Sequence, residues 1–374
     1  FYKFMLQGAQ QSWQPETKQT AVSYSGLSSG EYTFKLMAKN SAGIWNKEPV
    51  TISFKIKPPF WQTVIFWIII IIIALSLVLV YIKIRERKLV SEKHLLEEKV
   101  KERTTEISQK NKELEVYTKN VTGSIKYAKR IQDAMLPAEE YLNRILPEHF
   151  ILYQPKDIVS GDYYWAAKKG DMLIVAAVDC TGHGVPGAFM SMLGITLLDE
   201  IVNKKNVLGA ARILDEMREA VIKSLKQKGM RGETQDGMDI ALCSINVKTL
   251  EMQFAGAYNP MYIIRNNELL KFKANRMPIG IYYKNTGSFS NHIIQLQEND
   301  IIYLFSDGYI DQFNEYTGEK IMTKNFRNFL LKSCHLPMKK QHDYLLEKLN
   351  DWKGSIEQVD DVLIIGLRIN FDHE

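Results

Sequence analysis

The chain has 374 residues, of which 45% are hydrophobic, and its formal net charge is +5. This length exceeds what one hydrophobic core usually serves, so we predict two or three structural units. The small charge gives no case for nucleic-acid binding. All three cysteines lie in the C-terminal part without a CxxC pair, which excludes a zinc finger and fits a reducing compartment there. Because the chain begins inside a strand-like run without a signal peptide, we interpret it as the C-terminal piece of a longer polypeptide.

The first 59 residues alternate apolar and polar side chains in short runs, for example at 31–38 and 50–56. Clusters of turn-forming residues at 28–30 and 40–43 separate the runs. Alternation with a period of two, interrupted by turn residues, is typical of antiparallel strands. We therefore predict a small antiparallel β-sandwich at 1–59.

Three segments of this region, 27–34, 40–45 and 58–61, resemble a known sensor module. It is the fibronectin-III-like module of the Y_Y_Y type, which ends the periplasmic sensor region of two-component-type receptors. The resemblance implies that residues 1–59 are a periplasmic module that closes a longer sensor region, usually a β-propeller. The aromatic side chains of this module are then expected in its core and not in a ligand site.

Residues 60–82 form an apolar run that contains no charged side chain. About 20 apolar residues in a helix span the roughly 30 Å hydrocarbon core of a bilayer. Basic residues flank the run unequally, with Lys55 and Lys57 before it and Lys83, Arg85, Arg87 and Lys88 after it. The excess on the C-terminal side predicts a single transmembrane helix whose following residues are cytoplasmic, in a bacterial inner membrane.

The next segment, 83–123, has no proline and no glycine before Gly123. Apolar residues recur in it every seven positions, at Val100, Ile107, Leu114 and Val121. Charged residues, however, interrupt the companion heptad positions. This pattern predicts a parallel coiled coil of limited stability and hence a homodimer, and the alternative is a solvated single helix.

Aspartates stand where several hydrophobic runs begin or end. Asp179 ends the run 173–178, Asp307 follows 301–306, and the pair at 360 and 361 precedes 362–367. Asp162 lies just upstream, directly after a glycine. Runs of this length and β-branched content predict buried strands, whose ends can gather carboxylates from distant parts of the chain. Clustered carboxylates without His or Cys suit a hard divalent cation such as Mg²⁺ or Mn²⁺.

Four segments in this order, 160–164, 178–187, 305–308 and 358–361, resemble the motifs of SpoIIE-like serine/threonine phosphatases. These enzymes belong to the metal-dependent PPM superfamily, and the likeness extends over 124–370. The resemblance implies an α/β phosphatase domain in which an antiparallel β-sandwich is flanked by helices in αββα layers. It also implies hydrolysis by a water activated by two Mn²⁺ or Mg²⁺ ions, with helices near 185–203 and 210–226 as the switch element.

The same resemblance assigns roles to individual residues. The implied metal ligands are Asp162, Asp179 as the bridging and catalytic residue, the Cys180 carbonyl, Asp307 and Asp360. Asp361 is the alternative to its neighbour at the last position. His183 is the candidate that protonates the leaving oxygen, although its offset from the bridging aspartate is longer than in other members. Asp236 and Asp239 are candidates for a third, weaker metal position.

Together these features predict a membrane-anchored signalling phosphatase with an extracytoplasmic sensor. It would act on phosphoserine or phosphothreonine of a cytoplasmic regulatory protein, which by resemblance is a STAS-type anti-sigma-factor antagonist. One alternative is a histidine-kinase-like receptor, but His94 is the only histidine of the coil and no glycine-rich ATP-binding boxes follow. The other alternative is a scaffold without phosphatase activity, which has no physical need for converging carboxylates.

Overall fold

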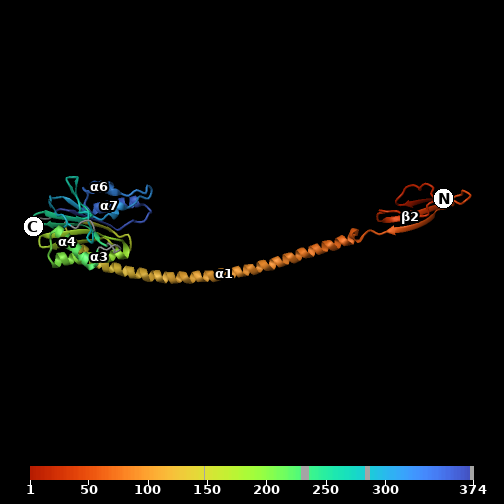
Figure 1. The fold of residues 1–374 in the computed structure, drawn as a ribbon. Coiled ribbons are helices and arrows are strands. Elements are labelled where there is room, and N and C mark those ends of the chain that lie inside the picture. Colours follow the sequence, from red (N-terminus) through yellow and green to blue (C-terminus); the bar gives the residue numbers. More distant parts are fainter. Residues whose placement is uncertain (147, 229–235, 283–286, 371–374) are drawn as a thin grey trace. The chain divides into compact units, whose positions relative to one another are not determined.

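The computed structural model describes residues 1–146, 148–228, 236–282 and 287–370 (Figure 1). The chain divides into two compact units, Phe1–Lys112 and Glu113–Glu374. Each unit is described by itself below. The division falls inside the long helix α1, so the predicted boundaries at 59, 82 and 123 stay predictions.

The N-terminal unit contains one three-stranded antiparallel sheet in the order β1-β2-β3. Its strands are β1 (Tyr2–Gln7), β2 (Gly30–Ala38) and β3 (Val50–Ile56). The predicted β-sandwich is wrong for the described residues, because no second sheet packs on this one. The side chains of β3 are exposed along nearly its whole length, and only Leu6 and Tyr32 are buried hydrophobic residues of this sheet.

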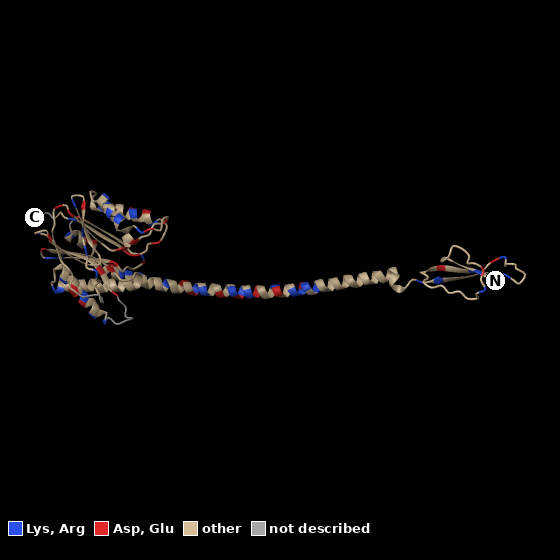
Figure 2. Ribbon diagram, turned by 45° about the horizontal axis from the view of Figure 1, so that its top comes forward, with Lys and Arg blue, Asp and Glu red and all other residues tan. Residues whose placement is uncertain are grey.

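Helix α1 (Val64–Met135) runs for 72 residues after a 3₁₀ turn at Phe60–Gln62. It ends just before Pro137, because proline cannot continue a helix. Lys, Arg, Asp and Glu are interspersed along its middle, whereas its first part carries none (Figure 2). The four apolar heptad residues that begin with Val100 are all exposed in the single chain, so the coiled coil and its alternative, a solvated single helix, stay predictions.

Two helices in the described ranges are long and apolar enough to cross a membrane, judged by length and composition alone. The first begins at Val64. Its most apolar 18-residue window has a mean hydropathy of 3.2, and none of that window is buried inside the structure. The second, Gly184–Lys204, has 56% of its window buried. Burial of that size assigns the second helix to the domain core, so the apolar start of α1 is the stronger candidate.

The C-terminal unit is built on two antiparallel five-stranded sheets. The first has the order β10 (Glu268–Phe272), β9 (Met261–Arg265), β12 (Ile301–Phe305), β13 (Val362–Arg368) and β4 (His149–Gln154). The second has the order β11 (His292–Gln295), β8 (Glu251–Ala257), β7 (Met238–Asn246), β6 (Met172–Cys180) and β5 (Tyr163–Lys169).

Helices cover the outer face of each sheet (Figure 1). On the second sheet lie α3 (Gly184–Leu198), which continues as a π-helical turn at Asp199–Lys204, and α4 (Ala210–Ser224). On the first lie α6 (Met322–Ser333) and α7 (Met338–Lys353). Two short helices, α2 (Glu139–Ile145) and α5 (Gly308–Asp311), complete the unit. The αββα layering predicted for this domain is confirmed.

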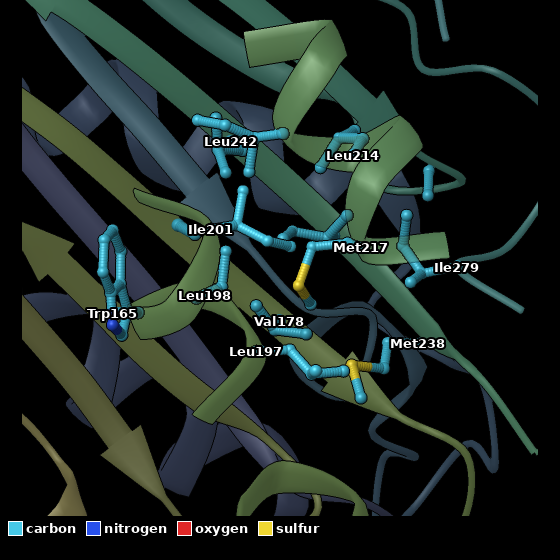
Figure 3. Close-up of a cluster of buried hydrophobic side chains, with 14 of the residues drawn as sticks. Trp165, Val178, Leu197, Leu198, Ile201, Leu214, Met217, Met238, Leu242 and Ile279 are labelled. Atoms are coloured by element: carbon cyan, nitrogen blue, oxygen red, sulfur yellow. The ribbon is translucent and has the colours of Figure 1, made fainter. Parts of the chain in front are cut away.

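Alternation along the strands explains the layers. One face of β6 joins the core under α3 and α4 through Ile174, Ala176 and Val178. The other face joins the core between the two sheets through Leu173, Val175 and Ala177. Leu198, Met217 and Leu242 meet in the first of these cores (Figure 3). Each large apolar side chain buried in this way contributes about 1.5–3 kcal/mol. This packing holds the ends of β6 and β7 in place.

Candidate active site

The predicted acidic residues lie at the ends of neighbouring strands. Asp162 immediately precedes β5 and Asp179 lies near the end of β6; the register pairs Tyr163 with Val178 across these two antiparallel strands. Asp307 follows β12, whose last residue pairs with Ile364 of β13, just after the acidic pair. Strand pairing therefore accounts for each of these two neighbourhoods, and the packing of the two sheets on one another brings Asp179 close to Asp307.

Asp239 lies directly opposite Asp179 in the β6–β7 ladder. Residues directly opposite in an antiparallel pair have Cβ atoms about 4.5–5.5 Å apart. Sequence reasoning gave this residue only a minor role, because the register of two strands is not visible in a single chain segment. Asp236 precedes the same strand, and its carbonyl oxygen accepts a hydrogen bond from the Gln227 side chain at 2.6 Å.

The carboxyl groups raise one another's pKa values. The pKa of Asp162 lies well above its ordinary value because the group is buried and faces Asp179. The pKa of Asp179 is also raised well above its ordinary value, first by burial and then by the charges of Asp307 and Asp239. Burial and Asp307 raise the pKa of Asp239 to about 7. The pKa of Asp307 is also raised, first by burial and then by Asp311. In the metal-free chain these groups therefore resist ionising together.

These residues fit a divalent cation by their chemistry. Within the described ranges the Oδ2 atom of Asp162 is buried without a hydrogen-bond partner, and the carboxyl groups of Asp179 and Asp307 lie close enough to affect one another's pKa. In the described ranges no group of three or more His, Cys, Asp or Glu residues is arranged to hold an ion. A backbone carbonyl such as that of Cys180 and water would complete the coordination of an ion held by these carboxylates, as is common for Mg²⁺.

The two members of the acidic pair have different surroundings. Asp361 is buried, and its two carboxylate oxygens accept the backbone N–H groups of Lys156 and Gly161, each at 2.7 Å. In the described structure the Asp360 carboxylate accepts only the N–H of its neighbour Asp361, at 2.8 Å, and the residue stays half-buried. Asp361 thus ties the loop before Asp162 to the start of β13, which leaves Asp360 as the residue of the pair with free acceptor capacity.

Gly308 allows the loop that follows Asp307 to approach the loop that contains Asp361 closely. A Cβ atom at this position would overlap the backbone carbonyl oxygen of Asp361. Because backbone atoms cannot move aside as a flexible side chain can, only glycine fits between Asp307 and its neighbours here.

Replacing Gly308 by alanine is therefore expected to separate the two loops. We expect destabilisation by about 1–3 kcal/mol, the range typical of overpacking a tight site, together with weaker metal binding. Thermal unfolding and calorimetric Mn²⁺ titration would measure both effects. Gly123→Ala is the control, since Gly123 is also a helical glycine without a positive φ and has open space around its Cβ position. Equal metal affinity in the Gly308 variant and the wild type would contradict the close-approach explanation.

His183 precedes α3 and lies between two charged side chains. Its Nδ1 atom is 2.7 Å from Asp157 Oδ2, and Lys156 Nζ is 3.0 Å from its Nε2. With Lys156 charged, the ammonium donates to Nε2 and the ring proton on Nδ1 is donated to Asp157. In this arrangement Nε2 holds no proton for a leaving group, so a role as proton donor requires Lys156 to move away.

Gln132 connects the end of α1 to the acidic loops. Its amide nitrogen donates to the Ser160 carbonyl at 2.6 Å and to Ser191 Oγ at 2.7 Å, and its oxygen accepts the Ser160 N–H at 3.1 Å. The side chain is buried, and Ser160 is two residues from Asp162. A lone glutamine on a long polar helix carries no sequence signal for such a role, so sequence reasoning missed it.

Replacing Gln132 by alanine is expected to leave the buried Ser160 N–H without its partner and the Ser160 carbonyl with only the 3.3 Å hydrogen bond from Ser191 Oγ. The expected loss is about 1–3 kcal/mol of stability, with weaker Mn²⁺ binding because the loop that carries Asp162 loosens. Chemical denaturation and calorimetric titration would test this. Lys126→Ala, an exposed change on the same helix, is the control. A Gln132 variant that matches this control in both measurements would show that the amide does not position the loop.

A cavity of about 680 Å³ opens beside the acidic residues of the candidate site. Asp239 and Asp307 line it, and so do the basic side chains Lys271, Lys273 and Arg276. No basic partner for the phosphate is evident in the motifs themselves. The strand order brings these cations from β10 and the segment after it to the acidic end of the sheets, so they too were visible only in the fold.

Comparison with known families agrees with this geometry. The family model for stage II sporulation protein E (SpoIIE) matches residues 169–370, which is more than half of the chain. The chain belongs to the SpoIIE family. Its C-terminal unit is a SpoIIE-family phosphatase domain of the PP2C type, and a Y_Y_Y domain matches residues 1–57. Both resemblances predicted from the sequence are confirmed.

Relatives of known structure share the fold of the SpoIIE domain. The SiaA-PP2C domain of Pseudomonas aeruginosa is 29% identical, with a TM-score of 0.61 over 68% of this chain and 98% of that one. The PP2C phosphatase domain of Bacillus subtilis SpoIIE, with a fragment of its regulatory domain, is 19% identical, with a TM-score of 0.50 over 61% of this chain and 63% of that one.

Among curated proteins, stage II sporulation protein E of Bacillus subtilis (strain 168) is 24% identical over 216 residues. The match covers 57% of this chain and 24% of that relative. The chain therefore spans about a quarter of the length of the relative, and the likeness concerns the phosphatase domain.

Proposed function

We propose that this chain is a signalling phosphatase that hydrolyses phosphoserine or phosphothreonine on a cytoplasmic regulatory protein. The observation that carries the proposal is the mutual facing of Asp162, Asp179, Asp239 and Asp307, none of which has a salt bridge in the described ranges. Such a cluster is unfavourable by itself and becomes favourable around divalent cations. The SpoIIE relationship supports the same chemistry.

In the proposed site, Asp179 would be the ligand shared between two Mn²⁺ or Mg²⁺ ions. The Cys180 carbonyl and Asp162 would complete one position, Asp307 and Asp360 would complete the other, and Asp239 would be the candidate ligand for a third. When bound, the ions supply activation of the attacking water and offset the charge of the phosphoryl group. Asp361 holds the loop before Asp162 through two backbone N–H groups and is a positioning residue and not a ligand.

We further infer a single-pass arrangement in the bacterial inner membrane. The apolar start of α1 would span the bilayer, with the Y_Y_Y domain outside and the SpoIIE domain in the cytoplasm. The exposed heptad residues of α1 support a homodimer, and the sensed signal would reach the acidic loop through α1 and Gln132. A STAS-type anti-sigma-factor antagonist is the substrate class that the family resemblance favours.

Phosphate release from phosphoserine peptides tests the proposed activity. The full chain, solubilised in mild detergent, is expected to release phosphate with Mn²⁺ or Mg²⁺ and to stop when EDTA is added. Asp171→Asn is a matched control, because Asp171 is exposed and pairs with Lys248 far from the site. No release with either metal on a panel of phosphoserine and phosphothreonine proteins would sink the proposal.

A second prediction concerns the predicted coiled coil at 83–123 and its effect on the phosphatase rate. A leucine zipper joined in heptad register to Val100 is expected to change the phosphatase rate several-fold, because it imposes one rotation on α1 and hence on Gln132. The same zipper joined out of register by three or four residues is the control, since such an insertion changes the rotation of the helix. Identical rates in both fusions and in the free chain would argue against regulation through dimerisation.

A further inference from the structure

Unpaired basic side chains line two adjoining cavities next to the candidate active site. The first, of about 680 Å³, contains Lys271, Lys273 and Arg276. The second, of about 550 Å³, contains Lys324 and Arg327 and shares Thr323 with the first. We call these two cavities together the basic groove. It begins at Asp239 and Asp307 and continues across β10 to α6.

The cations of the basic groove lack acidic partners in the described part of the chain. Nearby basic residues do have such partners: Arg265 of β9 contacts Asp300 at 2.6 Å, and Lys320, before α6, contacts Asp311 at 2.7 Å. The groove cations instead face one another, since burial, Arg327 and Lys273 together lower the pKa of Lys271. Like charges gathered in this way disfavour the free protein and favour an anionic ligand.

Arg327 provides a second, independent observation. Its Nε atom is buried and has no hydrogen-bond partner within the described ranges. Its guanidinium lies 5.3 Å from the centre of the Tyr262 ring, which also lines the first cavity. The ring contact fixes the guanidinium beside the groove, and within the described ranges no acidic side chain forms a salt bridge with it.

The shape and position of the groove indicate which anion it binds. A single phosphate is too small to contact both cavities, and the net charge of +5 gives no support to nucleic acid. If a phosphoserine reaches Asp239 and Asp307, as the proposed function requires, the substrate residues next to it must lie along the groove. Acidic side chains on those residues would meet the unpaired cations.

We propose that the basic groove binds acidic side chains that flank the phosphorylated residue of the protein substrate. This inference rests on the proposed phosphatase function and adds a substrate preference to it. Lys271 and Lys273 are the principal determinants at the near end, and Arg327 is the anchor at the far end. Electrostatic complementarity of this kind contributes specificity more than raw affinity.

Two phosphoserine peptides, identical except for glutamate or glutamine beside the phosphoserine, test the preference. The full chain in detergent with Mn²⁺ is expected to favour the glutamate peptide by about tenfold in kcat/KM, mainly through KM. K271E/K273E is expected to abolish or reverse the preference, and high salt is expected to weaken it. K339E/K340E, an equal charge change at exposed positions of α7, is expected to retain it. K271Q/K273Q serves if charge reversal impairs folding.

Binding of the unphosphorylated glutamate peptide, followed by fluorescence anisotropy, separates this inference from the proposed function. Binding that K271Q/K273Q weakens, in a chain that releases no phosphate, would support the groove and refute the phosphatase. Equal hydrolysis of both peptides, with equal effects of charge reversal on each, would overturn the groove and leave the phosphatase intact. Displacement of the peptide by inorganic phosphate at the same concentration as by a glutamate peptide would also overturn it, since the groove would then be a simple anion site.

Discussion

Asp179→Asn is expected to abolish metal-dependent phosphate release, with a loss on the order of 10³-fold or more, because metal activation supplies several kcal/mol to such reactions. Asp179 faces Asp307, Asp239 and Asp360, so its charge is the one that most directly balances a bound cation pair. Asp307→Asn is expected to act in the same direction. Steady-state phosphate release and calorimetric Mn²⁺ titration would measure the activity and the metal affinity of each variant.

Stability provides the control for this prediction. Removing one negative charge from a repelling cluster should leave the metal-free Asp179 variant at least as stable as the wild type, in contrast to most buried substitutions. The increase in Tm that Mn²⁺ causes in the wild type should shrink, since a ligand stabilises only the state that binds it. Asp171→Asn should keep both the activity and the Mn²⁺ effect. Full activity in the Asp179 variant would remove the proposed mechanism.

In the absence of divalent metal, the SpoIIE domain is expected to lose stability as the pH rises from about 4 to about 7. The folded-state pKa values of Asp162, Asp179 and Asp239 lie above the ordinary value of 3.8, and that of Asp239 reaches about 7. The folded chain therefore holds these protons more tightly than the unfolded chain. The stabilisation is fully present below the unfolded pKa and is lost as the pH passes through the folded values.

The expected loss is on the order of a few kcal/mol, and saturating Mn²⁺ should reverse it, because cations favour the ionised carboxylates. Urea denaturation across this pH range, with EDTA and with Mn²⁺, would measure it. Asp239→Asn should flatten the EDTA profile, whereas Asp171→Asn should not. A metal-free stability that rises steadily with pH up to neutrality would contradict the electrostatic account of the cluster.

The proposed relay from membrane to active site depends on one side chain with two kinds of partner. Gln132 belongs to α1 but replaces the backbone partners that Ser160 lacks, and it also contacts Ser191 of α3. A rotation of α1 would therefore disturb both the loop before Asp162 and a helix of the implied switch element. The zipper fusions and the Gln132 variant test the two ends of this connection separately.

Local pattern was sufficient for the elements of the phosphatase domain. Continuous apolar runs predicted β6, β12 and β13, and the aspartates at their ends predicted where the chemistry lies. The apolar run after Phe60 predicted the start of α1. The N-terminal region shows the limit of such patterns, because alternation predicts strands but does not say whether a second sheet covers them.

The amino-acid sequence by itself determined the SpoIIE relationship, the helical segment after the Y_Y_Y domain, and the acidic motifs, because each of these depends on residues that are neighbours in the chain. Only the tertiary structure decided that Asp239 faces Asp179, that Asp361 is occupied by the N–H groups of Lys156 and Gly161, and that Gln132 reaches Ser160. The same is true of the basic groove. These contacts depend on strand register and layer packing, which join positions far apart in the chain and leave no periodic trace in it.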